Sequence, residues 1–145
     1  MTTSTYFSVS DIKAAQPISG WEEFLAEGEA YLKTASGAHR KAKKVFTAEI
    51  LYNIIAMAIE KFVMAALMKH GALPYNHTMK DLVEAMDETF PKVLSKIKGE
   101  LLTMDSYQEI CDLDGFKITP PEMDKIPLML ELSQEMHTIV TRLVN

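Results

Sequence analysis

The densest group of side chains that could do chemistry is a run of cations, Arg40-Lys41-x-Lys43-Lys44, which follows His39. Lysine and arginine are the side chains that bind phosphate and other anions. Because we place this run at the start of a helix, where cations oppose the helix dipole, helix formation does not explain it. Two interpretations stay open: an anion-binding patch, or a solvated face neutralised by acidic residues of the preceding helix (Glu22, Glu23, Glu27 and Glu29).

A second polar group interrupts an otherwise apolar segment. Glu49, Asn53 and Glu60 are spaced by four and seven residues, which puts them on one side of a helix. That side faces either solvent or a buried polar cleft, and the spacing is the same in both cases. A cleft would make these three residues candidates for binding a nucleotide.

Two histidines are candidates for acid–base chemistry. His77 precedes a predicted helix start, where it acts either as a cap or packing residue or as a proton carrier. His137 lies on the last predicted helix and is either a partnered surface residue or a catalytic one. In an enzyme, either histidine would work with Glu49, Asn53 or Glu60.

Metal and thiol chemistry find no support in the spacing. Inward-facing Glu-x-x-His pairs would mark a di-metal bundle, but the residues three before each histidine are Ser36, Leu67, Pro74 and Gln134. The single cysteine, Cys111, is typical of a small buried residue near a helix end and cannot form an intramolecular disulfide. We therefore predict no metal, no cofactor and no catalytic residue. A single cysteine that cannot form an internal disulfide also favours a reducing compartment.

Helical spacing of apolar residues runs through almost the whole chain and predicts an all-α fold. We expect an antiparallel up-and-down bundle of four main helices plus a short helix. The first helix spans about 19–35, with a capping box from Ser19 to Glu22 and an end at Gly37. The second runs from about 39 to 70, with Gly71 after it, and is apolar over so wide an arc that several neighbours must cover it.

Three further helices complete the prediction. Thr78-x-x-Asp81 caps a short helix that Phe90-Pro91 ends. A fourth main helix follows over 91–113, up to a turn at Asp114-Gly115. The last begins at Thr119-Pro120-Pro121-Glu122, and Pro127 is expected to kink it or split off its first turn.

Length and composition favour one helical domain over 1–145, with an N-terminal extension over 1–18. The 145 residues carry a formal net charge of −5, which argues against a protein that coats nucleic acid through a generally basic surface. Only Arg40 and Arg142 are arginines. The first residues lack a signal-peptide pattern. The most apolar stretch, from Ile50, is interrupted at Glu60 and Lys61, short of the ~18–20 residues that a membrane span needs. We predict a cytoplasmic protein with no membrane association.

Several short motifs resemble the HEPN domain family. They are Ile59-Glu60-Lys61-Phe62-Val63-Met64-Ala65-Ala66-Leu67, then Lys69-His70-Gly71, Pro74 and His77-Thr78-x-x-Asp81-Leu82, followed by Met104-Asp105-Ser106-Tyr107 and the Thr-Pro-Pro-Glu helix start. The resemblance covers about residues 20–142. It implies a helical bundle that commonly dimerises and often works beside a minimal nucleotidyltransferase, as a toxin–antitoxin-like or nucleotide-linked module.

Many members of that family are ribonucleases that use an Arg-x4–6-His motif, and this sequence departs from it. Neither Arg40 nor Arg142 stands at that spacing before any histidine. We therefore expect a non-catalytic binding or partner module, associated with a nucleotide or RNA and acting as a homodimer or with a nucleotidyltransferase. The alternatives are a divergent ribonuclease or nucleotide-handling enzyme, and a purely structural interaction subunit.

Overall fold

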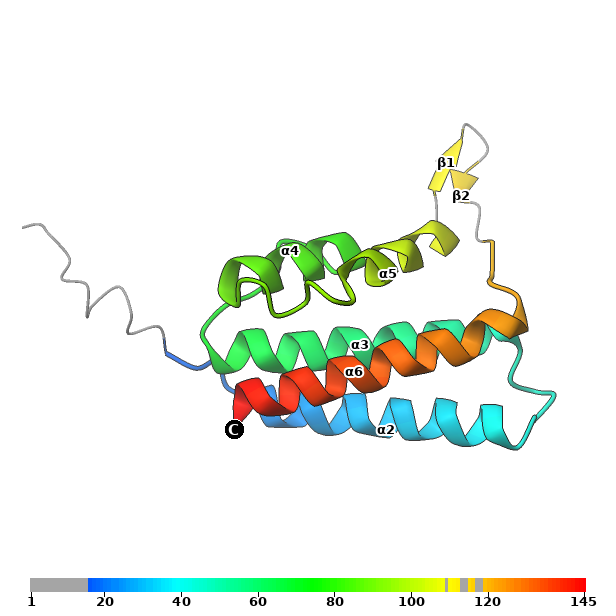
Figure 1. Cartoon of the computed structure of the whole chain (residues 1–145), viewed down its shortest axis with the longest axis horizontal. Helices are drawn as coiled ribbons and strands as arrows, with labels where there is room; N and C mark the ends of the chain where they lie inside the picture. Colours follow the sequence, from blue (N-terminus) through cyan, green and yellow to red (C-terminus); the bar gives the residue numbers. More distant parts are fainter. Residues whose placement is uncertain (1–15, 109, 113–114, 117–118) are drawn as a thin grey trace, which may run out of the picture.

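Three long helices lie side by side in the computed structural model, and two shorter ones cover α3 on its other side (Figure 1). The long ones are α2 (Trp21–Arg40), α3 (Ala48–Lys69) and α6 (Ile126–Val144), and the shorter ones are α4 (Met79–Thr89) and α5 (Lys98–Thr103). The structure describes residues 16–108, 110–112, 115–116 and 119–145. The predicted all-α bundle is confirmed. The predicted extension over 1–18 lies largely outside the described residues, in 1–15.

Helix α3 is the centre of the core, as its wide apolar arc predicted. Ile55, Ile59, Phe62 and Leu67 have no measurable exposure to solvent, because α2, α6 and α4 pack around them. By length and composition α3 could also cross a membrane, yet 61% of its most apolar window is buried inside the molecule. A buried core helix can have the same length and hydropathy as a membrane span, so these two properties alone do not identify one.

The boundary between the first two predicted helices is wrong. Helix α2 continues through Gly37 to Arg40, because Ala35 and Ala38 are buried against the core and packing outweighs the low helix propensity of glycine. Helix α3 begins at Ala48 rather than near 39. Its N-cap is Thr47, whose Oγ1 accepts a hydrogen bond from the Ile50 amide at 3.2 Å.

The start of α2 also differs from the prediction. Gly20, in the left-handed region with φ 98°, is the N-cap, and no side chain caps the helix, so the predicted Ser19 capping box is absent. The preceding segment is held differently: the Ile18 amide donates to the Met68 carbonyl at 2.7 Å. The C-terminal end of α3 thereby fixes the entry into α2.

Helix α4 is predicted well. Thr78 caps it through the Asp81 amide, and it ends at Thr89, just before Phe90-Pro91. Asp105 adds a tertiary cap, because its carboxylate accepts hydrogen bonds from the Met79 and Lys80 amides at 3.0 and 2.9 Å.

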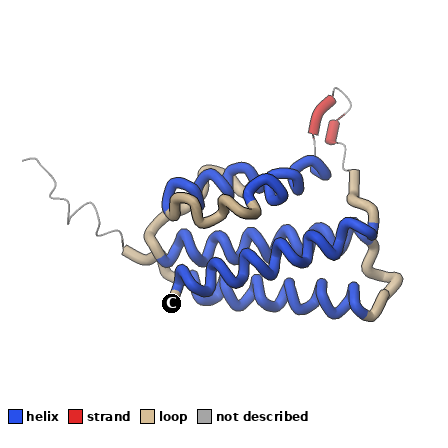
Figure 2. The backbone as a smooth tube through the Cα atoms, viewed as in Figure 1, coloured by secondary structure: helices blue, strands red, loops and turns tan. Residues whose placement is uncertain are grey.

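The fourth predicted main helix, over 91–113, is wrong. Residues 91–97 form turns, with Lys92 in the left-handed region at φ 68°, and only α5 and the 3-10 helix η1 (Met104–Gln108) follow. The chain then forms two short antiparallel strands, β1 (Ile110–Asp112) and β2 (Gly115–Phe116), at one end of the bundle (Figure 2). Cys111 lies in β1 rather than near a helix end. Asp114, in the predicted turn, is outside the described residues.

The predicted effect of Pro127 is confirmed. A 3-10 turn, η2 (Met123–Lys125), is split off, and α6 starts at Ile126 with the proline in its first turn. The predicted helix start at Thr119-Pro120-Pro121-Glu122 is wrong, because these four residues are not helical and Glu122 only precedes η2. This arrangement places η2 at the same end of the bundle as the connection between α2 and α3, where Met123 and Phe46 line one hollow.

Candidate anion-binding site

The cations of the sequence run lie at the C-terminal end of α2 and in the connection to α3. His39 and Arg40 form the last turn of α2, and the chain then reverses at Ala42, which has φ 48°. The amides of Lys41 and Lys43 donate to the carbonyls of Gly37 and Ala38 at 3.1 and 3.2 Å. The prediction that these cations stand at a helix start is therefore wrong. At the end of α2 they complement the dipole.

A hollow of about 360 Å³ lies beside this turn. We call it the cationic hollow, and its lining comprises Lys33, Thr34, Gly37, Ala38, Arg40, Lys41, Lys43 and Phe46. Four of these eight residues are cations and none is acidic. All four cations are exposed, so their charges are hydrated and accessible to a ligand. Lys33 was missed by the sequence analysis, although it stands seven residues before Arg40 and so on the same side of a helix.

The glutamates expected to neutralise this cluster lie elsewhere. Glu27 pairs with Lys61 at 2.7 Å and Glu29 with His137 at 2.8 Å. Glu22 and Glu23 belong to the first turn of α2, and 20 helical residues span about 30 Å. Within the described part of the chain, no ion pair involves Lys33, Arg40 or the lysines at 41, 43 and 44. The cations therefore form a solvated face, as one interpretation expected, but these glutamates do not pair with them.

A second hollow, of about 410 Å³, joins the first along α2. It is lined by Glu29, Leu32, Lys33, Ser36, Gly37, Arg40, Gln134 and His137. The His137 Nε2 lies 2.8 Å from the Glu29 carboxylate, and its ring lies 5.0 Å from the Phe62 ring. Arg40 and His137 thus line one hollow, although the sequence spacing separates them. Only the packing of α6 against α2 brings them together.

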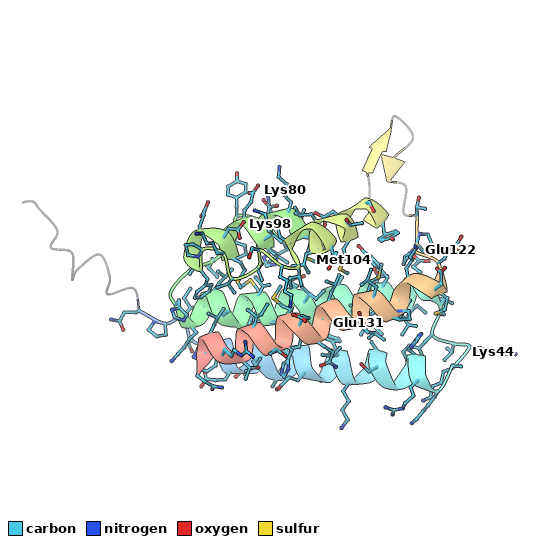
Figure 3. All side chains as sticks on the ribbon, in the orientation of Figure 1. Lys44, Lys80, Lys98, Met104, Glu122 and Glu131 are labelled. Carbon is cyan, nitrogen blue, oxygen red and sulfur yellow. The ribbon has the colours of Figure 1, made fainter. Side chains whose placement is uncertain are left out.

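A third hollow, of about 270 Å³, adjoins the cationic hollow and shares Ala38, Lys43 and Phe46 with it. We call it the apolar hollow, and its lining comprises Ala38, His39, Ala42, Lys43, Lys44, Phe46, Thr47, Leu51 and Met123. Lys44 borders this hollow and not the cationic one. Figure 3 shows Lys44 at the outer edge of the connection between α2 and α3.

The polar stripe of α3 forms a separate, solvent-facing group. Glu49 and Asn53 are exposed, and Glu60 is half-buried beside His77, whose Nδ1 lies 2.7 Å from the Glu60 carboxylate. None of these four residues lines the three hollows above. The solvent-side interpretation of the stripe is the one that the structure supports, and the pairing of Glu60 with His77 accounts for both side chains.

Tyr52 is a buried polar side chain that links two elements of the bundle, and the sequence analysis did not single it out. The Tyr52 hydroxyl donates to the Met104 carbonyl at 2.7 Å, and its ring meets Tyr107 edge-on at 5.5 Å. Burial, followed by the charge of Asp105 and the neighbouring Tyr107, raises the pKa of Tyr52 to about 12. This tyrosine ties α3 to η1 and is structural.

Comparison with protein-family models, with curated proteins and with solved structures finds no match to this chain. Among the described residues, no group of three or more His, Cys, Asp or Glu side chains is placed to hold a metal ion. The candidate site is therefore defined by its geometry alone, as a set of unpaired cations around a hollow.

Proposed function

We propose that this chain is a non-catalytic, HEPN-like cytoplasmic binding module that takes a phosphate-bearing ligand, a nucleotide or RNA, at the cationic hollow. The observation that carries the proposal is the lining of that hollow, in which four cations gather and no carboxylate competes for them. The HEPN resemblance adds a homodimer, or a complex with a nucleotidyltransferase, as the assembly in which the module works.

The electrostatics favour a bound anion. Lys33, Arg40, Lys41 and Lys43 repel one another across the hollow, and an anion among them relieves that repulsion. The Thr34 hydroxyl adds a hydrogen-bond donor to the same lining. Gly37 leaves room at the helix surface, because a Cβ added there would meet nothing within 4 Å.

The direct test removes three charges from the cationic turn. The variant Lys41→Ala/Lys43→Ala/Lys44→Ala should bind ATP and a single-stranded RNA of about 12 nucleotides at least about tenfold more weakly than the wild type at low salt. A matched control removes three lysines of the α4–α5 region, as Lys80→Ala/Lys92→Ala/Lys96→Ala. Lys80 lies on the far side of α3 from Lys44 (Figure 3). Equal affinity in the first variant and the wild type, or equal losses in both variants, would overturn the proposal.

The assembly is tested separately by light scattering after size exclusion over a range of concentrations. We expect a mass of twice 16.3 kDa for the homodimer. A chain that stays monomeric throughout and fails to co-purify with a nucleotidyltransferase encoded beside it would remove this part of the proposal and leave anion binding to stand alone.

A second candidate function is that of a divergent ribonuclease, and a specific observation favours it. Arg40 and His137 line the same hollow, and Glu29 holds the imidazole. In such an enzyme arginine would steady a phosphate and histidine would carry the proton. Comparing RNA cleavage by His137→Ala with cleavage by His77→Ala tests this function. Both histidines pair with a glutamate, but only His137 lines the hollow, so only its loss should abolish activity.

A further inference from the structure

We infer that the ligand of the cationic hollow is a single nucleotide rather than an RNA chain, with its phosphates in the cationic hollow and its base in the neighbouring apolar hollow. This inference rests on the proposed function. It adds the second half of the ligand, the flat apolar part, and the residues that receive it.

The two hollows adjoin. Ala38, Lys43 and Phe46 line both of them. Lys43 therefore stands where the charged part of a ligand would meet its apolar part. A ligand that filled both hollows would need several negative charges at one end and an uncharged flat group at the other, as a nucleoside triphosphate has.

The apolar hollow offers apolar and aromatic side chains to a base. Phe46 and Met123 line it beside the ring of His39, with the buried Leu51 behind them. The rest of the lining is Ala38, Ala42, Lys43, Lys44 and Thr47. Bases bind apolar and aromatic side chains through their faces, without any need for a particular hydrogen-bond pattern. Met123 is 45% exposed although it is apolar, and its thioether can adapt to a flat partner.

The charge pattern limits the length of the anion. Lys33 to Lys41 spans only about 12 Å of helix, and the next hollow along the groove between α2 and α6 already has a carboxylate in its lining, that of Glu29. Further along, the hollow that shares Ser36 and Gln134 has three, from Glu100, Glu131 and Glu135, against one lysine. An RNA backbone that followed the groove would meet these acidic residues, whereas the phosphates of one nucleotide would not.

The experiment compares three probes by calorimetry without divalent cations: ATP, inorganic tripolyphosphate and a single-stranded RNA of about 12 nucleotides. Tripolyphosphate carries more negative charge than ATP, so charge alone favours it. We expect ATP to bind about tenfold more tightly than tripolyphosphate, through its base. The variant Met123→Ser should remove that advantage and leave the affinity for tripolyphosphate unchanged.

Val45→Ser is the matched control. Val45 is 72% exposed in the same connection but lines neither hollow, so its variant should keep the advantage of ATP. Thermal melts of both variants check that each is folded. Equal binding of ATP and tripolyphosphate, a Met123→Ser variant that keeps the preference, or RNA that binds more tightly than ATP would each overturn this inference while leaving anion binding intact. If none of the three probes binds, the proposed function fails as well.

Discussion

The two halves of α2 carry their charges in opposite ways. In the first half, up to Glu29, Glu27 and Glu29 are paired with Lys61 and His137, and Gly28 lies directly against the Phe62 ring. In the second half, from Lys33 onward, the cations have no acidic partner among the described residues, and the helix surface opens into hollows.

This difference indicates that the two halves of α2 have different roles, one in stabilising the fold and the other in binding a ligand. Charges that already have a partner have little left to offer a ligand, whereas unpaired charges beside a hollow keep their full attraction for one. The first half of α2 therefore stabilises the bundle, and the second half offers the stronger attraction to an anionic ligand.

The strongest test of this comparison replaces one glycine by alanine in each half of α2. A Cβ at Gly28 would lie 2.7 Å from two carbon atoms of the Phe62 ring and 3.2 Å from the Ala58 carbonyl oxygen. Overpacking costs about 1–3 kcal/mol, more than the ~1 kcal/mol that alanine gains over glycine in a helix. Gly28→Ala should therefore lower the free energy of unfolding by up to about 2 kcal/mol.

Gly37→Ala serves as the counterpart, because a Cβ there meets nothing within 4 Å. It should raise the free energy of unfolding, by up to about 1 kcal/mol. Urea unfolding of both variants measures the contrast. Two shifts of the same sign would show that the two halves are packed alike.

The fold was largely predictable because its signals are local. Thr78, Gly71 and Pro127 act on the residues next to them, and a cap or a proline has nearly the same effect in any protein. The boundary near Gly37 was missed because burial of Ala35 and Ala38 extends α2, and burial depends on residues far along the chain. The helix over 91–113 failed for a related reason: its apolar residues reach the core from turns as well as from a helix, as buried Leu94 and Ile97 do.

The candidate site was only half predictable. The cations from Arg40 to Lys44 are adjacent in sequence, so their cluster was visible. Which of them line one hollow depends on the reversal at Ala42, and the meeting of Arg40 with His137 depends on how α6 packs. Met123 gave no signal, because an exposed methionine in a short turn looks like any other surface residue.

A second test concerns Tyr52, the buried side chain that links α3 to η1. The pKa of Tyr52 is about 12 in the folded state, whereas its ordinary value is 10.0. The folded state keeps this proton while the unfolded state loses it, so stability falls as the pH rises from 10 to 12.

Tyr52→Phe tests this pH dependence. At pH 7 it should cost about 1–2 kcal/mol, because the buried Met104 carbonyl loses its donor. Between pH 10 and 12 the variant should lose less stability than the wild type, and thermal melts across this range measure the difference. If both proteins decline in parallel, the titration of Tyr52 is not what weakens the fold.

The smallest effects are expected when one paired charge and one unpaired charge of α2 and its connection are removed in turn. Glu27→Gln breaks an ion pair in which Lys61 also lies 4.4 Å from the centre of the Phe24 ring, and it should cost at most about 1 kcal/mol, as exposed pairs do. Lys43→Gln removes a charge that has only like-charged neighbours in the cationic hollow, so it should leave stability unchanged or raise it by a few tenths of a kcal/mol. Added salt should shrink both differences, because it screens attraction and repulsion alike. A Lys43→Gln variant that is clearly less stable than the wild type would mean that the cation has a structural partner after all, and the contrast between the two halves of α2 would then be lost.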